Sequence, residues 1–390
     1  MRVLFSSTRG AGHLQPLLPY ARAVAAKGHE VLVAGPPDLS SDLRAAGFEH
    51  AAFGHPGDEG LAPIWKRLRD VPAEEQAELV VKEVFGGANA KAAFPGALET
   101  IRTWQPQLLV RDSVEFGSLV AAEVAGIEHV RVAVHQRVAE EQICRLVEEP
   151  LDSLRQAAGL AGDGGVSLRG ERIFTSFPES FEGPAQGEAA GLVYRVGPVK
   201  AMSSDGGSTW QAGTDGLPLV YITFGTVATN SRDAYQLYRT AVAAIAELPV
   251  RGLLTTGRGF DVSVLGEVPA NLRVEEWVPQ AEVFRHAAAM VCHGGSGTVL
   301  GGLGAGVPQV VLPYSADQPQ NARSIKAIGA GVALTNPDVA TLRDAIERVL
   351  TDAAFREAAR VVSREMSTLP TVDEAADALL DLAQTRRRRS

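Results

Sequence analysis

The sequence predicts an α/β protein made of two domains, each a doubly wound parallel sheet, with a cleft between them as the ligand site. Three observations support this fold class. The chain has 390 residues, which exceeds the usual size of one domain. Short apolar strands alternate with helical segments in both halves, as in parallel sheets covered by helices on both faces. A stretch rich in glycine, serine and aspartate separates the halves.

The strand pattern defines the predicted domains. The first domain is predicted for residues 1–203 and the second for 217–370, with a linker at 204–216. Residues 371–390 are predicted as a C-terminal helix and a basic tail, in which the arginine run 386–389 is expected to be disordered and solvated. Strands are expected in the first domain at 3–6, 31–34, 108–110 and 129–134, and in the second at 219–224, 252–255, 272–274, 290–292 and 310–312.

Composition and charge exclude several classes of function. The chain is 45% hydrophobic and 21% charged, as expected of an ordinary globular protein. A net charge of -9 argues against nucleic acid or an anionic membrane as the main partner. No apolar run has the length of a signal peptide or a membrane span, so no stable membrane insertion is expected. The two cysteines are far apart in sequence, which favours a reduced, cytoplasmic protein.

A glycine-rich turn follows the predicted strand 290–292. The glycines in HGGSGT lack the Cβ atoms that would keep an anion from the backbone, and Ser296 and Thr298 can cap the next helix. The free amides at that helix start form a site for a phosphate, to which His293 could also donate. The structural alternative is a tight strand-to-helix turn with a buried histidine, which is common in α/β proteins.

A polar loop follows the next predicted strand, 310–312. It contains Asp317, Gln318, Gln320 and Asn321, which can recognise the hydroxyls of a sugar. Loops beyond the carboxyl ends of parallel strands are where open α/β sheets bind ligands. A solvated loop without such a role is the alternative.

A second candidate site follows the first strand. Gly10 and Gly12 begin a dinucleotide-binding pattern, but Gln15 replaces its third glycine, which argues against NAD. His13 is a candidate general base, and Asp112, at the end of another strand, would face the same crevice and fix its tautomer. The alternatives are a histidine that caps the helix or faces solvent, and an aspartate that caps the helix after it. A cap and a catalytic role are compatible.

These motifs resemble a known family. The patterns GHxxP, HGGxGT, GxGVPQ and DQxxNA are similar to those of the nucleotide-sugar glycosyltransferases of family 1, which include bacterial enzymes that decorate antibiotics. The resemblance implies a GT-B fold, in which two Rossmann-like domains enclose a cleft. It also implies that His13 deprotonates the acceptor hydroxyl and that Asp112 supports it.

The resemblance further implies a set of donor-binding residues. Trp277 would stack on the pyrimidine base with Gln280 nearby, and Thr226 would touch phosphate. The structural alternatives are a tryptophan in the core and a threonine that caps a turn. The full expected set is Gly12, Thr226, Arg258, Trp277, Val278, Gln280, His293, Gly295, Ser296, Gly297, Thr298, Asp317, Gln318 and Asn321.

One position departs from the family pattern. Many members have a glutamate eight residues after the phosphate-binding histidine, where it accepts hydrogen bonds from the ribose, but here Gly301 occupies that position. A deoxyribose donor loses less from that absence, so the sequence slightly favours a dTDP-sugar over a UDP-sugar.

The expected function is the inverting, metal-independent transfer of a hexose from a dTDP- or UDP-sugar to a hydroxyl of a small hydrophobic natural-product acceptor, giving a β-type O-glycoside. The irregular segment 53–94 resembles the variable region that shapes an apolar acceptor pocket, although ordinary helices packed on the sheet would explain it equally well. No metal site and no cofactor are expected, since the nucleotide sugar is a co-substrate, and the protein is expected to be a monomer or homodimer. The alternatives are a sugar-nucleotide epimerase, a transferase with a lipid acceptor, or a non-catalytic protein that binds nucleotide sugars.

Overall fold

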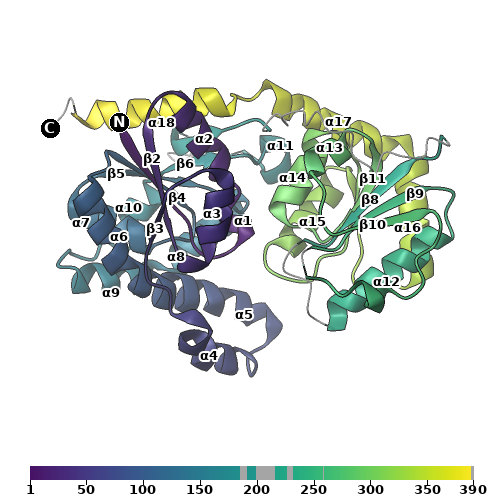
Figure 1. Ribbon diagram of the computed structural model, residues 1–390, viewed down its shortest axis with the longest axis horizontal. Coiled ribbons are helices and arrows are strands. Elements are labelled where there is room, and N and C mark those ends of the chain that lie inside the picture. Colours follow the sequence, from purple (N-terminus) through teal and green to yellow (C-terminus); the bar gives the residue numbers. More distant parts are fainter. Residues whose placement is uncertain (185–190, 199–215, 226–231, 258, 388–390) are drawn as a thin grey trace. The chain divides into compact units, whose positions relative to one another are not determined.

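The chain forms two compact units. The computed structural model describes residues 1–184, 191–198, 216–225, 232–257 and 259–387. Unit 1 comprises Met1–Phe177, Pro184–Gly197 and Pro370–Ser390, and unit 2 comprises Pro178–Gly183 and Pro198–Leu369. Figure 1 shows a sheet with helices on both faces in each unit, so the predicted fold class is confirmed.

The sheet of unit 1 has seven parallel strands in the order β3-β2-β1-β4-β5-β6-β7. The prediction identified β1, β2, β4 and β5 but missed three short strands, namely the edge strands β3 and β7 and the strand β6 beside β7. The strands are β1 (Arg2–Ser6), β2 (Glu30–Gly35), β3 (His50–Ala52), β4 (Leu108–Asp112), β5 (Glu128–Val132), β6 (Arg172–Thr175) and β7 (Val193–Arg195).

Alternate side chains of the central strand β1 enter two different cores. Val3 and Phe5 pack in one core with residues of α2 and α18, whereas Leu4 packs on the other face with residues of α6 and α7. This alternation is the physical basis of the doubly wound arrangement. The helices are α1 (Ala11–Leu14), α2 (Leu18–Ala26), η1 (Pro37–Leu39), α3 (Ser40–Ala46), α4 (Gly57–Leu68), α5 (Ala73–Leu79), η2 (Val80–Asn89), α6 (Ala90–Trp104), α7 (Gly117–Ala125), α8 (Arg137–Leu146), α9 (Glu148–Ala157), α10 (Val166–Arg169) and α18 (Val372–Arg387).

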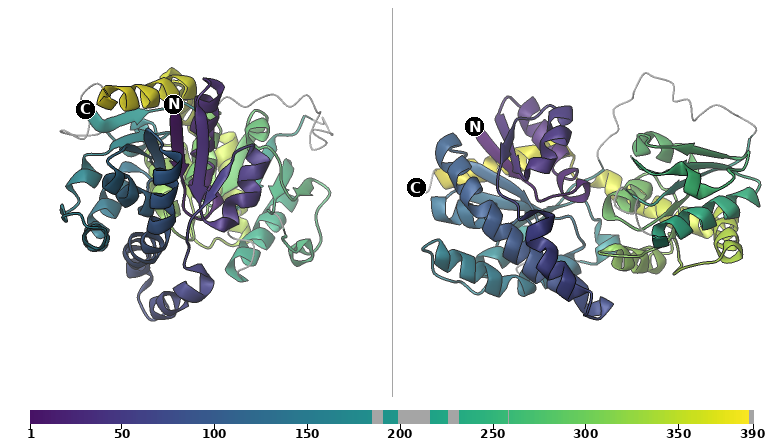
Figure 2. Two further views of the ribbon diagram at one scale, coloured as in Figure 1. Left: turned by 60° about the vertical axis from the view of Figure 1, so that its left-hand side comes forward. Right: turned by 60° about the horizontal axis from the view of Figure 1, so that its bottom comes forward.

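The C-terminal helix α18 is an integral part of unit 1. Ala375, Ala376 and Leu379 are fully buried in the core that also contains Val24 of α2, and Figures 1 and 2 show the two helices side by side. The predicted boundaries set 371–390 apart as a separate helix and tail. The helix ends at Arg387, and the last two arginines of the run 386–389 lie outside the described residues.

The sheet of unit 2 has six parallel strands in the order β10-β9-β8-β11-β12-β13. The prediction identified five of them and missed the edge strand β13. The strands are β8 (Leu219–Thr223), β9 (Arg251–Thr255), β10 (Leu272–Glu275), β11 (Ala287–Cys292), β12 (Gln309–Val311) and β13 (Gly331–Ala333). The helices are α11 (Glu179–Glu182), α12 (Arg232–Ala246), η6 (Val262–Leu265), α13 (Gln280–Phe284), α14 (Ser296–Gly304), α15 (Gln318–Ala327), α16 (Val339–Thr351) and α17 (Ala353–Thr368).

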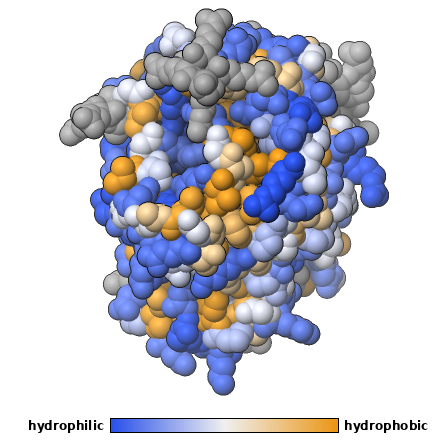
Figure 3. Space-filling model, turned by 90° about the vertical axis from the view of Figure 1, so that its left-hand side faces the viewer, coloured by the Kyte–Doolittle hydropathy of each residue, from blue (hydrophilic) through white to orange (hydrophobic). Residues whose placement is uncertain are grey.

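One exposed face is mainly hydrophilic (Figure 3), and the two cysteines form no disulfide. The face in Figure 3 is largely hydrophilic, with a smaller group of hydrophobic residues towards its middle. Cys144 and Cys292 are both free and buried, one in each unit. Within the described ranges, no helix is long and apolar enough to cross a bilayer.

Candidate functional site

The structure brings His13 and Asp112 together at the carboxyl edge of the first sheet. Strands β1 and β4 are neighbours, with Ser6 opposite Arg111, so the residues that follow them meet at one edge. Gly10, at φ 116°, turns the chain into the short helix α1 that carries His13. The His13 Nδ1 atom lies 3.4 Å from Oδ1 of Asp112, and the imidazole is 19% exposed while the carboxylate is fully buried.

Backbone amides hold the Asp112 carboxylate in place. The amide of Thr8 donates to its Oδ2 at 2.6 Å, and the amide of Val114 donates to its Oδ1 at 2.8 Å. Burial raises the pKa of Asp112, but His13 and these two hydrogen bonds outweigh that effect, so the pKa lies below its usual value. The carboxylate is therefore ionised and can stabilise an imidazolium at His13.

The helix that follows β4 is capped by Glu115 and not by Asp112. Helix α7 begins at Gly117, and Oε1 of Glu115 accepts hydrogen bonds from the amides of Gly117 and Ser118, at 2.9 and 3.2 Å. The cap that was the structural alternative for Asp112 is thus supplied by Glu115. Asp112 instead accepts hydrogen bonds from the amides of Thr8 and Val114 and faces His13.

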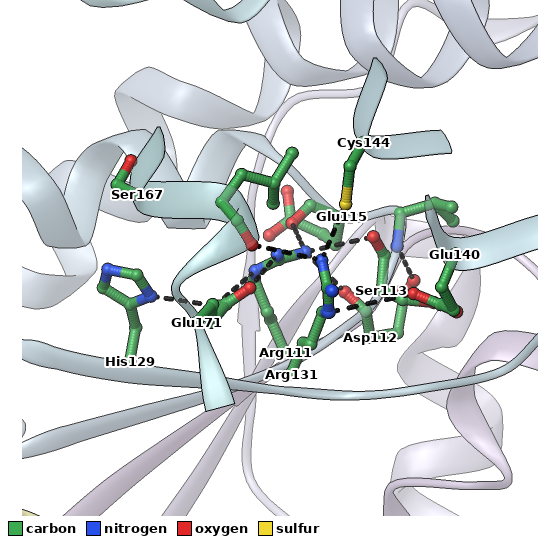
Figure 4. A network of polar contacts seen from close by, with 12 residues as sticks. Arg111, Asp112, Ser113, Glu115, His129, Arg131, Glu140, Cys144, Ser167 and Glu171 are labelled. Carbon is green, nitrogen blue, oxygen red and sulfur yellow. Dashed lines mark hydrogen bonds and ion pairs between the residues drawn. The ribbon is translucent and has the colours of Figure 1, made fainter. Parts of the chain in front are cut away.

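A buried ion pair supports the loop that carries Asp112. Arg111 Nη1 donates to the backbone oxygens of Asp112 at 3.0 Å, Ser113 at 3.2 Å and Glu115 at 3.3 Å, and its guanidinium also binds both carboxylate oxygens of Glu171 (Figure 4). The sequence analysis missed this pair, although an arginine inside an apolar strand was a visible signal.

The charge of Glu171 is strongly stabilised. Burial alone would raise the pKa of Glu171, but Arg111 and the His129 ring, whose Nδ1 lies 2.8 Å from its Oε1, lower that pKa to about 2. The carboxylate therefore stays ionised beside Arg111, and the arginine is held over the loop carbonyls.

A second histidine, also missed from the sequence, lies beside His13. His135 comes shortly after β5, and the centroid of its ring is 6.4 Å from that of His13. The centroid of the Phe85 ring, which belongs to η2, is 5.7 Å from the centroid of the His13 ring. The available signal was that His135, like His13, follows the end of a predicted strand.

In unit 2, the glycine turn at the end of β11 holds His293. Cβ atoms placed on Gly225 and Gly295 would lie 2.7 and 2.5 Å from Nε2 of His293, so both positions must lack a side chain for the ring to fit. Gly297, at the start of α14, has open space where its Cβ would be, as the predicted approach of an anion requires. The glycines therefore serve two purposes, of which the sequence analysis anticipated one.

His293 is neutral near pH 7. Burial lowers the pKa of His293 to about 4, although the charge of Asp317 and the backbone of Thr223 act in the opposite direction. A neutral imidazole keeps one N–H as a hydrogen-bond donor. Such a donor can bind a phosphate oxygen without carrying a permanent charge.

The polar loop after β12 is locked to the glycine turn. The side-chain amide of Asn321 donates to the backbone oxygen of Gly294, to Oγ of Ser296 and to Oδ2 of Asp317 at 2.9 to 3.0 Å, and the Ser296 hydroxyl also donates to Asp317. Asn321 is fully buried. The polar atoms of Asn321 and Ser296 join the loop to the turn, because a buried amide must find partners inside the protein. A contact of these two residues with the donor stays a prediction.

Gln318 also makes its hydrogen bonds within the loop. Its Oε1 atom accepts from the amides of Tyr314 and Ser315, at 3.0 and 3.1 Å, and the residue is 7% exposed. Asp317 is only half buried. Of the two residues expected to bind the sugar, Asp317 is therefore the more accessible one.

The remaining donor residues are placed as follows. The Trp277 side chain is 65% exposed, which rules out the core position that was its alternative, while Val278 is buried. Gln280 begins α13 and donates to Oη of Tyr221 at 3.1 Å. Thr298 is buried in α14 and Gly12 lies in α1 with open space around it. Thr226 and Arg258 lie outside the described residues.

Gly301 is part of a packed contact. A Cβ on Gly301 would lie 2.7 Å from Cε2 of Phe284, whose ring is edge-on to Tyr221 at a centroid distance of 5.8 Å. A side chain at position 301 therefore requires Phe284 to move. The aromatic ring of Phe284 thus occupies the space next to Gly301.

Among the residues that the structure describes, no three His, Cys, Asp or Glu side chains are grouped so that they could hold a metal ion.

Comparison with known proteins identifies the family. Residues 245–382 match the family described as erythromycin biosynthesis protein CIII-like, C-terminal domain. The elloramycin glycosyltransferase ElmGT of Streptomyces olivaceus is 32% identical over 393 residues, which cover 96% of each chain. The glycosyltransferase SnogD from Streptomyces nogalater is similar in structure with a TM-score of 0.79 and 28% identity, over 98% of this chain and 99% of SnogD.

A further solved relative has known ligands. The spinosyn rhamnosyltransferase SpnG in complex with spinosyn aglycone matches with a TM-score of 0.82 and 28% identity, over 97% of this chain and 100% of SpnG. SpnG is also known in complex with thymidine diphosphate. The protein described here therefore belongs to the nucleotide-sugar glycosyltransferases of family 1, among the enzymes of antibiotic biosynthesis, and is a glycosyltransferase with the GT-B fold.

Proposed function

We propose that the protein transfers a hexose from a nucleoside diphosphate sugar to a hydroxyl of a small hydrophobic natural-product acceptor, with inversion at the anomeric carbon. The observation that carries this proposal is the His13–Asp112 pair, a partly exposed imidazole in front of a buried, ionised carboxylate. In this pair, the imidazole can act as a general base, and the carboxylate can stabilise the imidazolium that forms.

The proposed reaction is a single displacement. Nε2 of His13 takes the proton of the acceptor hydroxyl while the oxygen of that hydroxyl forms a bond to the anomeric carbon. The bond from that carbon to the diphosphate oxygen breaks on the opposite face, so an α-linked donor gives a β-glycoside. Asp112 stabilises the imidazolium formed in this step.

Unit 2 is proposed to bind the leaving nucleoside diphosphate without a metal ion. The free amides at the start of α14, the open backbone at Gly297 and the neutral N–H of His293 are donors for the diphosphate oxygens. Asp317, held by Ser296 and Asn321, is proposed to accept hydrogen bonds from sugar hydroxyls. The exposed Trp277 is proposed to stack on the base.

We propose that the donor is a dTDP-sugar. The contact between Gly301 and Phe284 supports this choice, because it leaves no acidic partner at position 301 for a ribose hydroxyl. A buried hydroxyl without a partner costs about 1 to 3 kcal/mol, a cost that a deoxyribose avoids at its 2′ carbon. The thymidine diphosphate complex of SpnG is further support.

The test is a mass-spectrometric screen of dTDP- and UDP-hexoses against a panel of hydroxylated polyketides and phenols. His13→Ala should abolish transfer and leave the affinity for dTDP, measured by calorimetry, nearly unchanged. His50→Ala, a histidine on β3 of the same unit that bonds to Ser40 and Gly35, is the matched control and should retain transfer. Unchanged turnover in His13→Ala would sink the assignment.

The same screen separates the alternatives. Formation of an epimerised sugar nucleotide from donor alone would indicate an epimerase. Tight dTDP binding without transfer to any acceptor would indicate a binding protein.

A further inference from the structure

Unit 1 contains a second histidine–carboxylate pair next to the His13–Asp112 pair. Nδ1 of His135 lies 3.5 Å from Oε1 of Glu140, and the same oxygen accepts a hydrogen bond from the His135 backbone amide at 3.3 Å. The imidazole is 20% exposed, close to the value for His13, and the carboxylate is 3% exposed. Each pair thus presents a partly exposed ring with a buried acid on its Nδ1 side.

Glu140 is a fixed negative charge. Burial raises the pKa of Glu140, but the neighbouring His135 and the guanidinium of Arg131, whose Nε is 3.8 Å from its Oε2, lower it below its usual value. Arg131 is itself buried and donates to Sγ of Cys144 at 3.1 Å (Figure 4). A carboxylate held in this way favours the His135 tautomer with the proton on Nδ1, so that Nε2 is a hydrogen-bond acceptor.

The surroundings of the two rings indicate a binding site for an apolar molecule. The ring of His135 is edge-on to that of His13, with an interplanar angle of 62°, and the Phe85 ring is tilted by 51° relative to that of His13. Phe85 belongs to η2, which winds as a π-helix, a conformation that occurs frequently at functional sites. The Phe85 ring and the oriented His135 imidazole are therefore both neighbours of His13.

We propose that His135, oriented by Glu140, binds a second hydroxyl of the acceptor while His13 deprotonates the first. The preferred acceptor is then an aromatic or otherwise apolar ring with two neighbouring hydroxyl groups. A centroid separation of 6.4 Å allows two adjacent oxygens to reach one ring each through hydrogen bonds of about 2.8 Å. Only the first hydroxyl loses its proton, to His13, and the second keeps its proton and donates to His135. This inference rests on the proposed function.

The test compares two acceptors that differ by one hydroxyl, 2,3-dihydroxynaphthalene and 2-naphthol, with a donor that the wild type uses. The wild type should favour the dihydroxy compound about tenfold in kcat/KM, the value of one good hydrogen bond. In His135→Phe this ratio should fall to near one, mainly through a higher KM for the dihydroxy compound, with kcat for 2-naphthol retained. His135→Gln, whose amide oxygen can accept a hydrogen bond, should restore part of the preference.

Val138→Ala is the matched control, because Val138 is an exposed side chain on α8, the helix that carries Glu140, and should leave the ratio unchanged. An equal preference in wild type and His135→Phe would overturn the inference, as would a loss of kcat on both acceptors in a folded His135→Phe protein. If the wild type uses no acceptor in the wider screen, the proposed function itself fails. Transfer that is indifferent to His135 refutes only the second-hydroxyl site.

Discussion

Replacing Asp112 by asparagine tests the pairing with His13 most directly. Both oxygens of Asp112 accept hydrogen bonds from backbone amides, Oδ2 from Thr8 and Oδ1 from Val114, and Oδ1 also faces Nδ1 of His13. An asparagine has only one oxygen. In either orientation, its NH₂ group must therefore face a buried N–H donor.

The two orientations have different costs. With NH₂ at the Oδ1 position, it opposes the amide of Val114 and forces Nδ1 of His13 to become an acceptor, which moves the His13 proton to Nε2 and removes the base. With NH₂ at the Oδ2 position, it opposes the amide of Thr8 at a site where the present distance is 2.6 Å. One lost hydrogen bond to a charged group destabilises unit 1 by about 1.5 to 3 kcal/mol, which lowers Tm by roughly 5 °C.

The rate should fall further than the stability. Loss of the correct tautomer and of the charge beside the imidazolium is expected to lower kcat by about 10³- to 10⁴-fold. The assay is the initial rate of transfer between pH 6 and 9, together with thermal unfolding by circular dichroism.

Asp152→Asn is the matched control, because Asp152 also accepts backbone hydrogen bonds on both oxygens, from Asp163 and Gly164. It should lower Tm by a smaller amount, because the Asp152 side chain is 25% exposed and water can replace a lost bond, and it should leave kcat unchanged. A loss of less than tenfold in the kcat of Asp112→Asn at every pH would refute the role of the carboxylate.

Three further predictions concern the supports of the two sites. The pKa of His293 is about 4 in the folded state and 6.5 is its ordinary value, so the unfolded chain binds more protons than the folded chain between these two values. The free energy of unfolding should therefore fall by about 3 kcal/mol as the pH drops from 6.5 to 4. His293→Asn should flatten this pH dependence, as measured by urea unfolding. Glu171→Gln leaves Arg111 buried without a counter-charge and should lower the free energy of unfolding by about 3 to 5 kcal/mol, as measured by chemical denaturation. A loss below about 1 kcal/mol would contradict the proposal that Glu171 holds Arg111 against the loop that carries Asp112. Gly301→Glu should lower the rate of transfer from both donors, because the new side chain would collide with Phe284. The double variant Gly301→Glu with Phe284→Ala should raise kcat/KM for the UDP-sugar relative to kcat/KM for the dTDP-sugar. An unchanged ratio in the double variant would argue against the proposal that position 301 determines the preference for ribose or deoxyribose.

Some features of the site could be predicted because they are local in sequence. His13 follows strand β1 and Asp112 ends strand β4, and the carboxyl ends of neighbouring parallel strands meet at one edge of the sheet. The turn at His293 was recognisable for a similar reason, since glycines between a strand and a helix start have few structural explanations. What the turn residues contact could not be predicted in the same way, because the hydrogen bonds of Asn321 depend on how two separate loops pack.

The short strands β3, β6 and β7 show which strands the sequence pattern does not reveal. They are short and carry few of the apolar residues that mark a buried strand, and their pairing is decided by neighbours far along the chain. Helix α18 is a similar case. Its helical pattern was visible, but only packing with α2 shows that it completes the first unit.

By itself, the sequence determined the class of the sheets, the two strand-to-helix turns and the histidine that begins the proposed reaction, because strand periodicity and turn chemistry are written in consecutive residues. Only the tertiary structure decided that Glu140 pairs with His135, that Phe284 fills the space at Gly301, and that His135 lies beside His13. These contacts join residues that are distant in the chain. Strand order and helix packing bring them together, and neither is encoded in any single segment.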